Sequence, residues 1–526
     1  MSEQELKLHV PRHVGTRVLT DMRKLGAAST RLLALYFDTS DRALVQARVA
    51  LRLRKEGRRW IQTLKMPGDH ALARIEINHP RPGPELDLSL YAGTPAEAVM
   101  SRLGKSLTVC YETNILRLFK QVRTRKGLVE IAFDRGSLRA GDLTLPVSEI
   151  EFELVRGDVE AIFAIGQRWL DRYPLIMDMR SKAERGDRLA QTSAALASIA
   201  DDTSPETPEA RQKIIQDFWS PRGAKGVKLA PDLSLRGALS AITTECLDQI
   251  VRNAAFLAEV DTLDICRTGT AEHIHQLRVG IRRLRSAWSL FSGLPVLPPE
   301  TIRQEVKVHF AALGTSRDDD VLRDALMPIL TKAGLPPIEL GVTISSDEAH
   351  TLVTSHAFQS WLLNTLKTCV LPPPPTAVAA SVVTDLPSAS IAVQHPPEKA
   401  ANVIVNRLRK WHKRISRDGL QFKKLDIDSQ HELRKRAKRL RYGLQFAESL
   451  LPSGRLKAYR KRLSVVQDIL GDMNDLVVAK ERFESLRETQ PGAWFACGWI
   501  TSRLTALNDE AAAALAQLAK SDQFWK

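Results

Sequence analysis

With 526 residues, the chain is too long for one ordinary hydrophobic core, and we expect about two to four domains. A hydrophobic content of 44% with 26% charged residues excludes a disordered chain. The 76 Lys and Arg residues against 61 Asp and Glu residues give a net charge of +15. This excess indicates an anionic partner but does not distinguish nucleic acid, polyphosphate and acidic lipid.

The cysteines and the apolar segments indicate the compartment. The five cysteines are odd in number and far apart, and no pair has the spacing of a metal site, which favours a reducing environment. The stretch MSEQELKLH lacks the apolar segment of a secretory signal, and no run of about 18 apolar residues occurs. We therefore expect a cytoplasmic protein without a membrane partner.

The pattern of apolar residues changes along the chain. Up to about residue 190 the apolar period is mostly two, which predicts antiparallel strands. Residues 195–230 are rich in Pro, Ser, Asp and Gly, as in a linker, and from about 233 the period becomes helical. A Pro-rich stretch at 371–390 interrupts the helical half. The predicted domains are 1–195, a connector at 196–230, and two helical domains at 231–390 and 391–526.

An internal repeat supports the division of the helical half. The group His275, Arg278, Arg282, Arg283 and Arg285 recurs 156 residues later as His431, Arg434, Lys438, Arg439 and Arg441. Leu313-Gly314 and Asp318 recur as Leu470-Gly471 and Asp475, at an offset of 157. Two similar helical bundles related by a pseudo-twofold axis explain this better than a solenoid does.

Charged residues share one face of the predicted strands. Glu3, Glu5 and Lys7 alternate with Leu6 and Leu8, so the two sets point to opposite sides. The same division recurs at Arg52 and Arg54, at Arg74 and Glu76, at Glu130 and Asp134, and at Glu149, Glu151 and Glu153.

Two interpretations of this charged face remain open. An antiparallel sheet with one solvated face is the common case. Here, however, carboxylates gather on some strands and Arg or Lys on others. A sheet closed into a barrel with these charges inside would need divalent cations for its carboxylates, and its basic residues would bind phosphates.

The motifs of the N-terminal part resemble the CYTH, or triphosphate tunnel metalloenzyme, family. They are ExExK at 3–7, LRLRKE at 51–56, TLK at 63–65, RIE at 74–76, FDRG at 133–136, EIEFE at 149–153 and SKAERG at 181–186. The resemblance implies an eight-stranded antiparallel tunnel that hydrolyses or rearranges a triphosphate with Mg²⁺ or Mn²⁺.

The resemblance also implies roles for individual residues. The metal ligands would be Glu3, Glu5, Asp134, Glu151 and Glu153, with Glu149 and Glu76 as further candidates. The substrate-binding residues would be Lys7, Arg52, Arg54, Lys65, Arg117 and Lys182. Glu5, Lys65 and Glu151 are the expected catalytic residues: a carboxylate or metal ion orients the attacking water, and Lys65 could protonate the leaving group.

Each copy of the helical repeat carries a basic stripe beside an apolar one. At about 100° per residue, His275, Arg278, Arg282 and Arg285 lie on one side of a helix, as do His431, Arg434, Lys438 and Arg441 in the second copy. Like charges on successive turns repel unless an anion or acidic partner balances them. A solvated surface remains the alternative for either copy alone, and the His spacing does not fit zinc.

The motifs HxxRVxxRRLR at 275–285, LGTSRDDDV at 313–321, HELRKRAKRLRY at 431–442 and VQDILGDMND at 466–475 resemble the helical CHAD family. The resemblance implies an all-α domain of two pseudo-symmetric four-helix bundles whose stripes, including Arg283 and Arg439, bind polyphosphate. The expected fold is therefore multidomain α+β.

The two resemblances together suggest a hydrolase that converts inorganic tripolyphosphate to pyrophosphate and phosphate and that also binds long-chain polyphosphate, in the cytoplasm or on polyphosphate granules. The alternatives are a non-catalytic polyphosphate-binding scaffold, or a tunnel enzyme acting on thiamine triphosphate or on ATP as an adenylate cyclase. Nucleic acid is not an expected partner, because the stripes lack interleaved aromatic residues.

Overall fold

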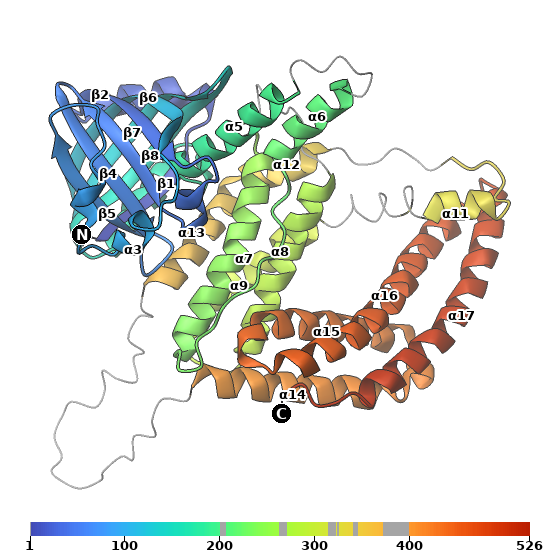
Figure 1. The fold of residues 1–526 in the computed structure, drawn as a ribbon. Helices are drawn as coiled ribbons and strands as arrows, with labels where there is room; N and C mark the ends of the chain where they lie inside the picture. Colours follow the sequence, from blue (N-terminus) through green and yellow to red (C-terminus); the bar gives the residue numbers. More distant parts are fainter. Residues whose placement is uncertain are drawn as a thin grey trace, which may run out of the picture. The chain divides into compact units, whose positions relative to one another are not determined.

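The computed structural model describes residues 2–199, 207–261, 271–313, 322, 326–339, 346–371 and 399–525 (Figure 1). The chain divides into two compact units. The first consists of Met1–Arg222, Val251–His273 and His350–Pro372, and the second of Gly223–Ile250, Ile274–Ala349 and Pro373–Lys526. The first unit thus includes two segments from the helical half of the sequence, so the units do not follow chain order.

The first unit is built on an antiparallel sheet. Its strands are β1 (Ser2–His9), β2 (Ala28–Asp38), β3 (Ala50–Glu56), β4 (Arg59–Pro67), β5 (Ala73–Arg81), β6 (Thr108–Arg123), β7 (Gly127–Ala140), β8 (Leu143–Gly157) and β9 (Ile176–Met177). Their order is β5-β4-β3-β2-β6-β7-β8-β1-β9, and β5 also pairs with β1. This additional pairing closes β1 to β8 into a barrel, and the two-residue β9 adds to β1. The predicted eight-stranded antiparallel barrel is confirmed.

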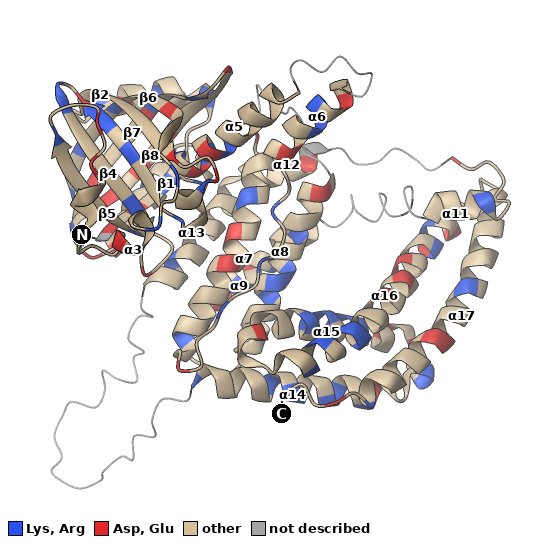
Figure 2. Cartoon of the chain, viewed as in Figure 1, with Lys and Arg blue, Asp and Glu red and all other residues tan. Residues whose placement is uncertain are grey.

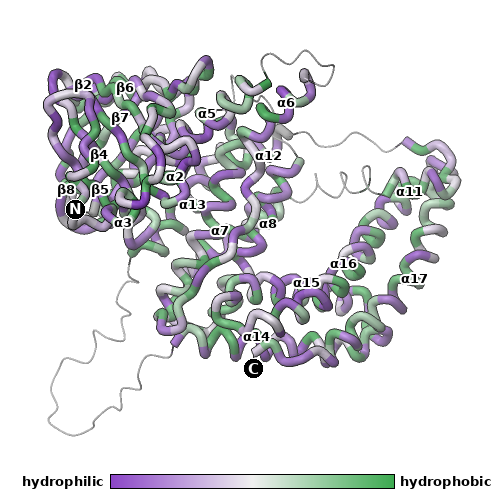
Figure 3. The backbone as a smooth tube through the Cα atoms, in the orientation of Figure 1, coloured by the Kyte–Doolittle hydropathy of each residue, from purple (hydrophilic) through white to green (hydrophobic). Residues whose placement is uncertain are grey.

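Short helices cover the apolar outer face of the barrel. They are α1 (Arg12–Lys24), α2 (Ala43–Gln46), η1 (Leu88–Tyr91), α3 (Glu97–Met100) and α4 (Glu160–Arg172). Leu51 and Leu64 form a buried cluster with Tyr91 and Met100 from η1 and α3. α4 packs on β8, β1 and β7. Hydrophobic and hydrophilic residues alternate along the strands, as a barrel with one apolar face requires (Figure 3).

Helix α5 (Lys182–Ala197) packs on β6, β7 and β8. Ser181 caps its start by accepting a hydrogen bond from the amide of Glu184 at 3.1 Å. Leu189 belongs to a buried cluster with Tyr36 and Tyr111 of β2 and β6. The hydroxyl of Tyr111 donates to the carbonyl oxygen of Ala183 at 2.9 Å. These contacts fix the first turn of α5 against the barrel.

The C-terminal half is mostly helical, as the periodicity predicts. Its described helices are α7 (Leu235–Leu257), α8 (Ala271–Leu290), α9 (Glu300–Ala312), α11 (Met327–Lys332), α12 (Ser346–Thr354), α13 (His356–Val370), α14 (Ala400–Gly419), η4 (Phe422–Lys424), α15 (Ile427–Phe446), η5 (Glu448–Leu450), α16 (Ser453–Glu484) and α17 (Gly492–Ala519). Helices α8 and α15 have the same length and begin 156 residues apart, in agreement with the repeat. Gly314 and Asp318 of the predicted repeat lie outside the described residues.

The stretch expected to be a connector contains regular structure. Thr207–Phe218 forms α6, and Phe218 and Trp219 join the buried cluster around Leu189. The prediction of a connector rested on the polar composition of this stretch and did not take the two aromatic residues into account. Among the described helices, none combines the length and the apolar character needed to cross a bilayer.

We expect Gly186→Ala to destabilise the first unit. A Cβ atom at Gly186 would lie 2.2 Å from the ring of Tyr111, so either the ring or α5 would have to move. Overpacking of this kind costs about 1–3 kcal/mol, which thermal unfolding followed by circular dichroism will detect.

Gly498→Ala in α17 is the matched control, because no atom lies within 4 Å of a Cβ built there. It should be neutral or stabilise the helix by about 0.5–1 kcal/mol. Equal melting temperatures for Gly186→Ala and the unchanged protein would contradict the predicted clash.

Candidate active site

Strand register places the charged residues of the barrel on one continuous face. The directly paired positions are Glu5 with Glu153, Lys7 with Glu151, Lys65 with Glu76, and Arg117 with Asp134. Side chains at directly paired positions point to the same side of a sheet. Contacts between strands that are not neighbours show that this side is the interior: Lys65 on β4 reaches Glu3 on β1, with Nζ 2.7 Å from Oε2.

Lys182 lies at the centre of the first charged cluster. Its Nζ is 2.7 Å from Asp134 Oδ2, 2.5 Å from Glu149 Oε1 and 2.6 Å from Glu151 Oε1. Arg117 donates to both carboxylate oxygens of Asp134, each at 2.7 Å, and also contacts Glu151. Burial opposes the charged form of Lys182, but the surrounding carboxylates outweigh burial and raise its pKa well above the usual value.

Lys65 occupies the corresponding position in a second cluster. Its Nζ lies 2.7 Å from Glu3 Oε2 and 2.6 Å from Glu76 Oε2. Arg52 approaches Glu76 at 4.0 Å and donates to the hydroxyl of Tyr36 at 3.2 Å. Burial would lower the pKa of Lys65, and the carboxylate of Glu3 reverses this, so the pKa is raised.

The interior holds more carboxyl groups than the nearby lysines and arginines can keep ionised. Burial, and then a hydrogen bond with Glu76, raise the pKa of Glu3 to about 8. The pKa of Glu76 is lowered, because the hydrogen bond with Glu3 and the charge of Lys65 outweigh its burial, so the pair shares one proton. Burial and the charge of Glu151 raise the pKa of Glu5 to about 7.

The remaining predicted residues of the barrel also lie in or beside these clusters. Lys7 is 3.6 Å from Glu149 and donates to the carbonyl oxygen of Arg180. Arg54 pairs with Glu56, and burial together with Arg52 lowers the pKa of Arg54 to about 10. Burial raises the pKa of Glu153, with the charge of Lys65 opposing.

The acidic residues fit a divalent metal ion. Ligand oxygens of Asp134, Glu149 and Glu151 lie within 4.8 Å of one another, and all three residues are buried. Such hard oxygen ligands suit Mg²⁺ or Mn²⁺. The raised pKa values of Glu3, about 8, and of Glu5, about 7, indicate a further unfilled demand for positive charge. Glu149, a further candidate ligand by the resemblance, is one of these three residues.

Sequence reasoning missed a layer of buried charges behind the first cluster. Arg185 donates to Glu149 at 2.9 Å and to Asp261 at 2.6 Å. Arg180 forms a bidentate pair with Asp178, both hydrogen bonds being 2.9 Å. Arg185 is part of the SKAERG motif, so its position was visible, but nothing in the sequence connected it with Asp261.

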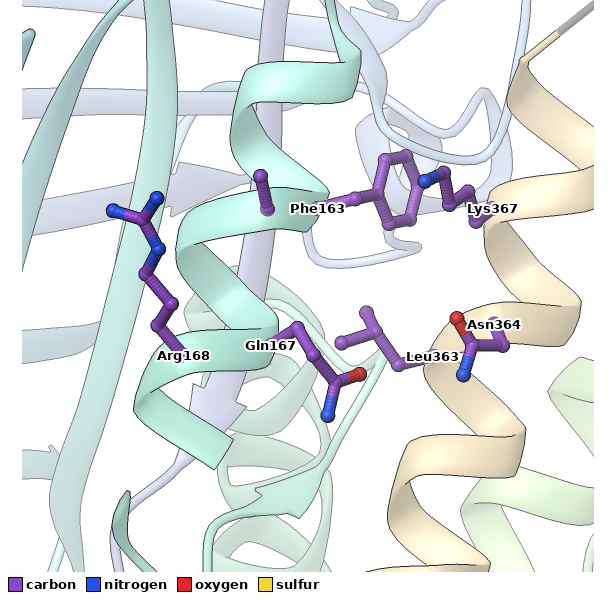
Figure 4. Close-up of a pocket in the computed structure, with 7 residues that line it drawn as sticks. Phe163, Gln167, Arg168, Leu363, Asn364 and Lys367 are labelled. Carbon is purple, nitrogen blue, oxygen red and sulfur yellow. The ribbon is translucent and has the colours of Figure 1, made fainter. Parts of the chain in front are cut away.

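A pocket outside the barrel wall is unrelated to these clusters. It lies between α4 and α13 and is lined by Phe163, Ala164, Gln167, Arg168, Leu363, Asn364 and Lys367 (Figure 4). It contains no residue of the predicted site.

In the second unit, the two predicted stripes lie on α8 and α15, where Lys and Arg residues gather (Figure 2). Burial lowers the pKa of Arg439, the charge of Glu432 opposes this, and the charges of Arg436, Arg285 and Arg414 add to the lowering. The guanidinium groups of Arg278 and Arg285 lie 5.2 and 5.3 Å from the centroid of the Phe310 ring. Arg285 of the first stripe therefore lies within electrostatic range of Arg439 of the second, and Phe310, which the sequence did not place there, lies beside two arginines of α8.

The two histidines of the stripes differ from each other in exposure. His275 is half-buried and His431 is exposed. Burial and the charges of Lys435 and Arg434 lower the pKa of His431, although a hydrogen bond with Asn474 opposes this. Arg434 lies 3.7 Å from Asp475, so the second stripe is partly balanced by α16.

The placement of Arg283 on the anion-binding stripe needs correction. Its side chain is fully buried, and it donates to Gln249 Oε1 at 2.6 Å and to the carbonyl oxygen of Lys225 at 2.9 Å. Its guanidinium also lies 5.4 Å from the centroid of the Phe446 ring. Successive residues of a helix are about 100° apart, so Arg283 points toward the core although Arg282, its neighbour in the motif, lies on the stripe.

Comparisons with known proteins agree with this geometry. The CYTH domain model matches residues 1–186, and the CHAD domain model matches residues 241–484. An inorganic triphosphatase from Haemophilus influenzae is 30% identical over 196 residues, which cover 35% of this chain and 54% of that protein. The chain thus spans about half the length of this curated relative.

Solved structures show similar parts. The CHAD domain from the plant Ricinus communis is 26% identical, with a TM-score of 0.42, covering 56% of this chain and 96% of that one. An adenylyl cyclase candidate from Hippeastrum, described as having a dominant triphosphatase activity, is 19% identical, with a TM-score of 0.27, covering 35% and 93%. Both TM-scores are below 0.5.

In a chelating buffer, we expect the first unit to lose stability as the pH rises from about 4.5 to about 8. Folded Glu3 and Glu5 hold their protons up to about pH 8 and 7, whereas the unfolded chain releases them near 4.5. The folded state binds more protons over this window, so the free energy of unfolding falls as the pH rises. Glu5→Gln should make the decline shallower, by on the order of 2 kcal/mol at pH 8, in thermal unfolding across a pH series.

Glu112→Gln on β6 is the control, since Glu112 is exposed and pairs with Arg139 at 3.5 Å outside the clusters. Its pH profile should match that of the unchanged protein. A Glu5→Gln profile with the full original slope would show that Glu5 does not titrate in this window.

Proposed function

The chain belongs to the CYTH family over residues 1–186 and to the CHAD family over residues 241–484, and from this premise we propose that it hydrolyses inorganic tripolyphosphate to pyrophosphate and phosphate inside the barrel. The name of the Haemophilus influenzae relative supports this substrate. We further propose that the helical domain binds long-chain polyphosphate in the cytoplasm or on polyphosphate granules. The proposed domains are 1–195, 231–390 and 391–526, with residues 196–230 between them.

The observation that carries the proposal is the pairing of cations with carboxylates in an enclosed interior. Lys65 and Lys182 each lie between carboxylates from different strands. Phosphate oxygens can replace the carboxylates as partners of these lysines, and metal ions can replace the lysines as partners of the carboxylates. A triphosphate–metal complex would therefore satisfy both sets at once.

The metal ions would be held by Asp134, Glu149 and Glu151, with Glu3, Glu5 and Glu153 as further ligands. A bound Mg²⁺ or Mn²⁺ would neutralise charge on the transferred phosphoryl group. The carboxylates would hold the ion in the interior, at a position set by their places on the strands.

The basic residues would bind and orient the substrate. Lys7, Arg52, Arg54, Lys65, Arg117 and Lys182 offer donors from β1, β3, β4, β6 and α5. Lys65, whose pKa is raised, would hold a proton beside the leaving oxygen. Glu5 and Glu151 would orient the attacking water, for which Glu5 is suited by a pKa of about 7.

For the helical domain, the proposal rests on the proximity of like charges. Burial lowers the pKa of both Arg285 and Arg439, and the charge of Arg285 lowers that of Arg439 further, so a bound anion would stabilise the charged forms of both. A polyphosphate chain supplies many negative charges without requiring stacking surfaces. The stripe residues His275, Arg278, Arg282, Arg285, His431, Arg434, Lys438, Arg439 and Arg441 are the proposed contacts.

We expect the protein to release phosphate from tripolyphosphate in the presence of Mg²⁺ or Mn²⁺, and Glu5→Gln to lower kcat at least about 100-fold, as loss of a group that acts on the reacting atoms does. The measurement is phosphate release from tripolyphosphate, longer polyphosphate, ATP and thiamine triphosphate, each with Mg²⁺, Mn²⁺ or a chelator. Circular dichroism will show whether the variant is folded.

Glu112→Gln should retain full activity, because Glu112 lies outside the charged clusters. Faster turnover of thiamine triphosphate or ATP than of tripolyphosphate would assign the barrel to that substrate instead. A folded protein that binds tripolyphosphate without hydrolysing it under any metal condition would be a scaffold.

We expect the double variant Arg285→Ala/Arg439→Ala to bind long-chain polyphosphate at least about tenfold more weakly and with a smaller dependence on salt, because two phosphate contacts are lost. Fluorescence anisotropy with labelled polyphosphate measures both quantities. Lys105→Ala/Arg172→Ala removes two exposed cations of the first unit and serves as the charge-matched control.

Arg283→Met should instead lower thermal stability, since Arg283 is fully buried. Competition with nucleic acid at equal phosphate concentration tests the ligand class. If duplex or single-stranded nucleic acid displaces polyphosphate, the polyphosphate assignment is wrong.

A further inference from the structure

Arg185 connects the first charged cluster with a carboxylate from a distant part of the sequence. One of its terminal nitrogens donates to Glu149 Oε2 at 2.9 Å, and the other donates to Asp261 Oδ1 at 2.6 Å and to the carbonyl oxygen of Pro146 at 2.9 Å. The side chains of Arg185 and Asp261 are 2% and 1% exposed. Glu149 is therefore oriented by an arginine that is itself fixed from behind.

Asp261 also lies near Arg180, the residue whose backbone contacts Lys7. Its Oδ2 lies 3.7 Å from a terminal nitrogen of Arg180. The guanidinium of Arg180 is bidentate with Asp178 and lies 4.3 Å from the centroid of the Trp219 ring. The carbonyl oxygen of the same Arg180 accepts a hydrogen bond from Lys7. One carboxylate thus contacts the arginines behind both a proposed metal ligand and a proposed phosphate ligand.

The segment that carries Asp261 is packed tightly into the first unit. Ala255 and Val260 form a buried cluster with Ile176 of β9. Phe256 belongs to the buried cluster of Trp219 and stacks on His273, with ring centroids 3.7 Å apart. Asp261 itself has a φ of 62°, a left-handed conformation that costs energy in a residue other than glycine and persists only where the surroundings hold it.

Electrostatics explain why such a carboxylate matters. Burial would lower the pKa of Arg185, and the charges of Asp261, Glu149 and Asp178 outweigh it and raise the pKa. With two carboxylates, Arg185 can orient Glu149 while leaving negative charge on it for a cation. Without the charge of Asp261, Arg185 would form a stronger ion pair with Glu149. Arg185 would then compete with a metal ion for the Glu149 carboxylate.

We propose that Asp261 is a positioning residue for the barrel's active site, although it lies in the part of the sequence matched by the CHAD model, residues 241–484. It acts through Arg185 on Glu149 and through Arg180 on Lys7. This inference rests on the proposed function, because it assigns Asp261 to the same metal and phosphate site. It follows that residues from the CHAD sequence complete the CYTH site within a single compact unit.

The test uses the full chain with Asp261→Asn, which keeps the size of the side chain and removes its charge. We expect kcat on tripolyphosphate to fall, and the Kd for Mn²⁺ in the absence of substrate to rise, each about 10- to 100-fold, as for other residues that orient metal ligands. Electron paramagnetic resonance of free Mn²⁺ gives the Kd without relying on turnover. KM for tripolyphosphate should change less than kcat.

Arg252→Ala is the matched control. Arg252 lies on α7 nine residues before Asp261 and forms an ion pair with Glu184 of α5, whose side chain is 45% exposed. It should leave kcat and the Kd for Mn²⁺ unchanged. If Asp261→Asn does not fold, Asp261→Glu keeps the charge, displaces the carboxylate and should still weaken Mn²⁺ binding.

A double-mutant cycle identifies the route. If Asp261 acts through Arg185, adding Asp261→Asn to Arg185→Gln should weaken Mn²⁺ binding no further. A lower melting temperature with unchanged Mn²⁺ affinity and kcat would make Asp261 merely structural and overturn the inference. A protein that does not hydrolyse tripolyphosphate, yet loses Mn²⁺ affinity with Asp261→Asn, would overturn the proposed function and leave the positioning role in place.

Discussion

The structure depends on the mutual compensation of opposite charges enclosed in a β-barrel. A charged group removed from water costs several kcal/mol unless it is paired and hydrogen-bonded. The barrel meets this requirement with Lys65 and Lys182, each bonded to carboxylates from more than one strand. The compensation is incomplete, since burial and neighbouring carboxyl groups raise the pKa of Glu3 to about 8 and that of Glu5 to about 7. That remaining demand for positive charge is what makes the interior receptive to metal ions.

The helical unit shows the opposite imbalance. Arg283 is satisfied inside the protein by Gln249 and by a backbone carbonyl group. Arg285 and Arg439 have no such arrangement between them and repel each other. One unit thus has carboxylates that need cations, and the other has cations that need an anion. A metal-bound phosphate chain is a ligand class that answers both needs.

Alternation along a strand is a local property, so it predicted the strands and their two faces. It left open whether the sheet closes, because closure depends on the pairing of β1 with β5, and the barrel was predicted from the resemblance to the CYTH family. The sequence also identified Lys65, Lys182 and Asp134, whose motifs place them on the inward face. It failed where the decisive neighbour is distant in the chain: Asp261 meets Arg185 across 76 residues, and no pattern records that contact. Arg283 was misplaced because a run of arginines was taken as one surface, whereas a helix turns each successive residue by about 100°. The aromatic pair at Phe218 and Trp219 was concealed by its polar surroundings.

The packing of α13 on α4 has a consequence for biosynthesis. Gln359 of α13 accepts a hydrogen bond from the amide of Met177 in β9 at 2.8 Å, and it is almost fully buried. A ribosome adds residues from the N-terminus onward at about 5–20 residues per second. The barrel strands, α4 and β9 therefore emerge many seconds before α13, which packs on α4 and β9. During that interval the nascent chain exposes an apolar surface, which makes it a natural client for chaperones that act on polypeptides still attached to the ribosome.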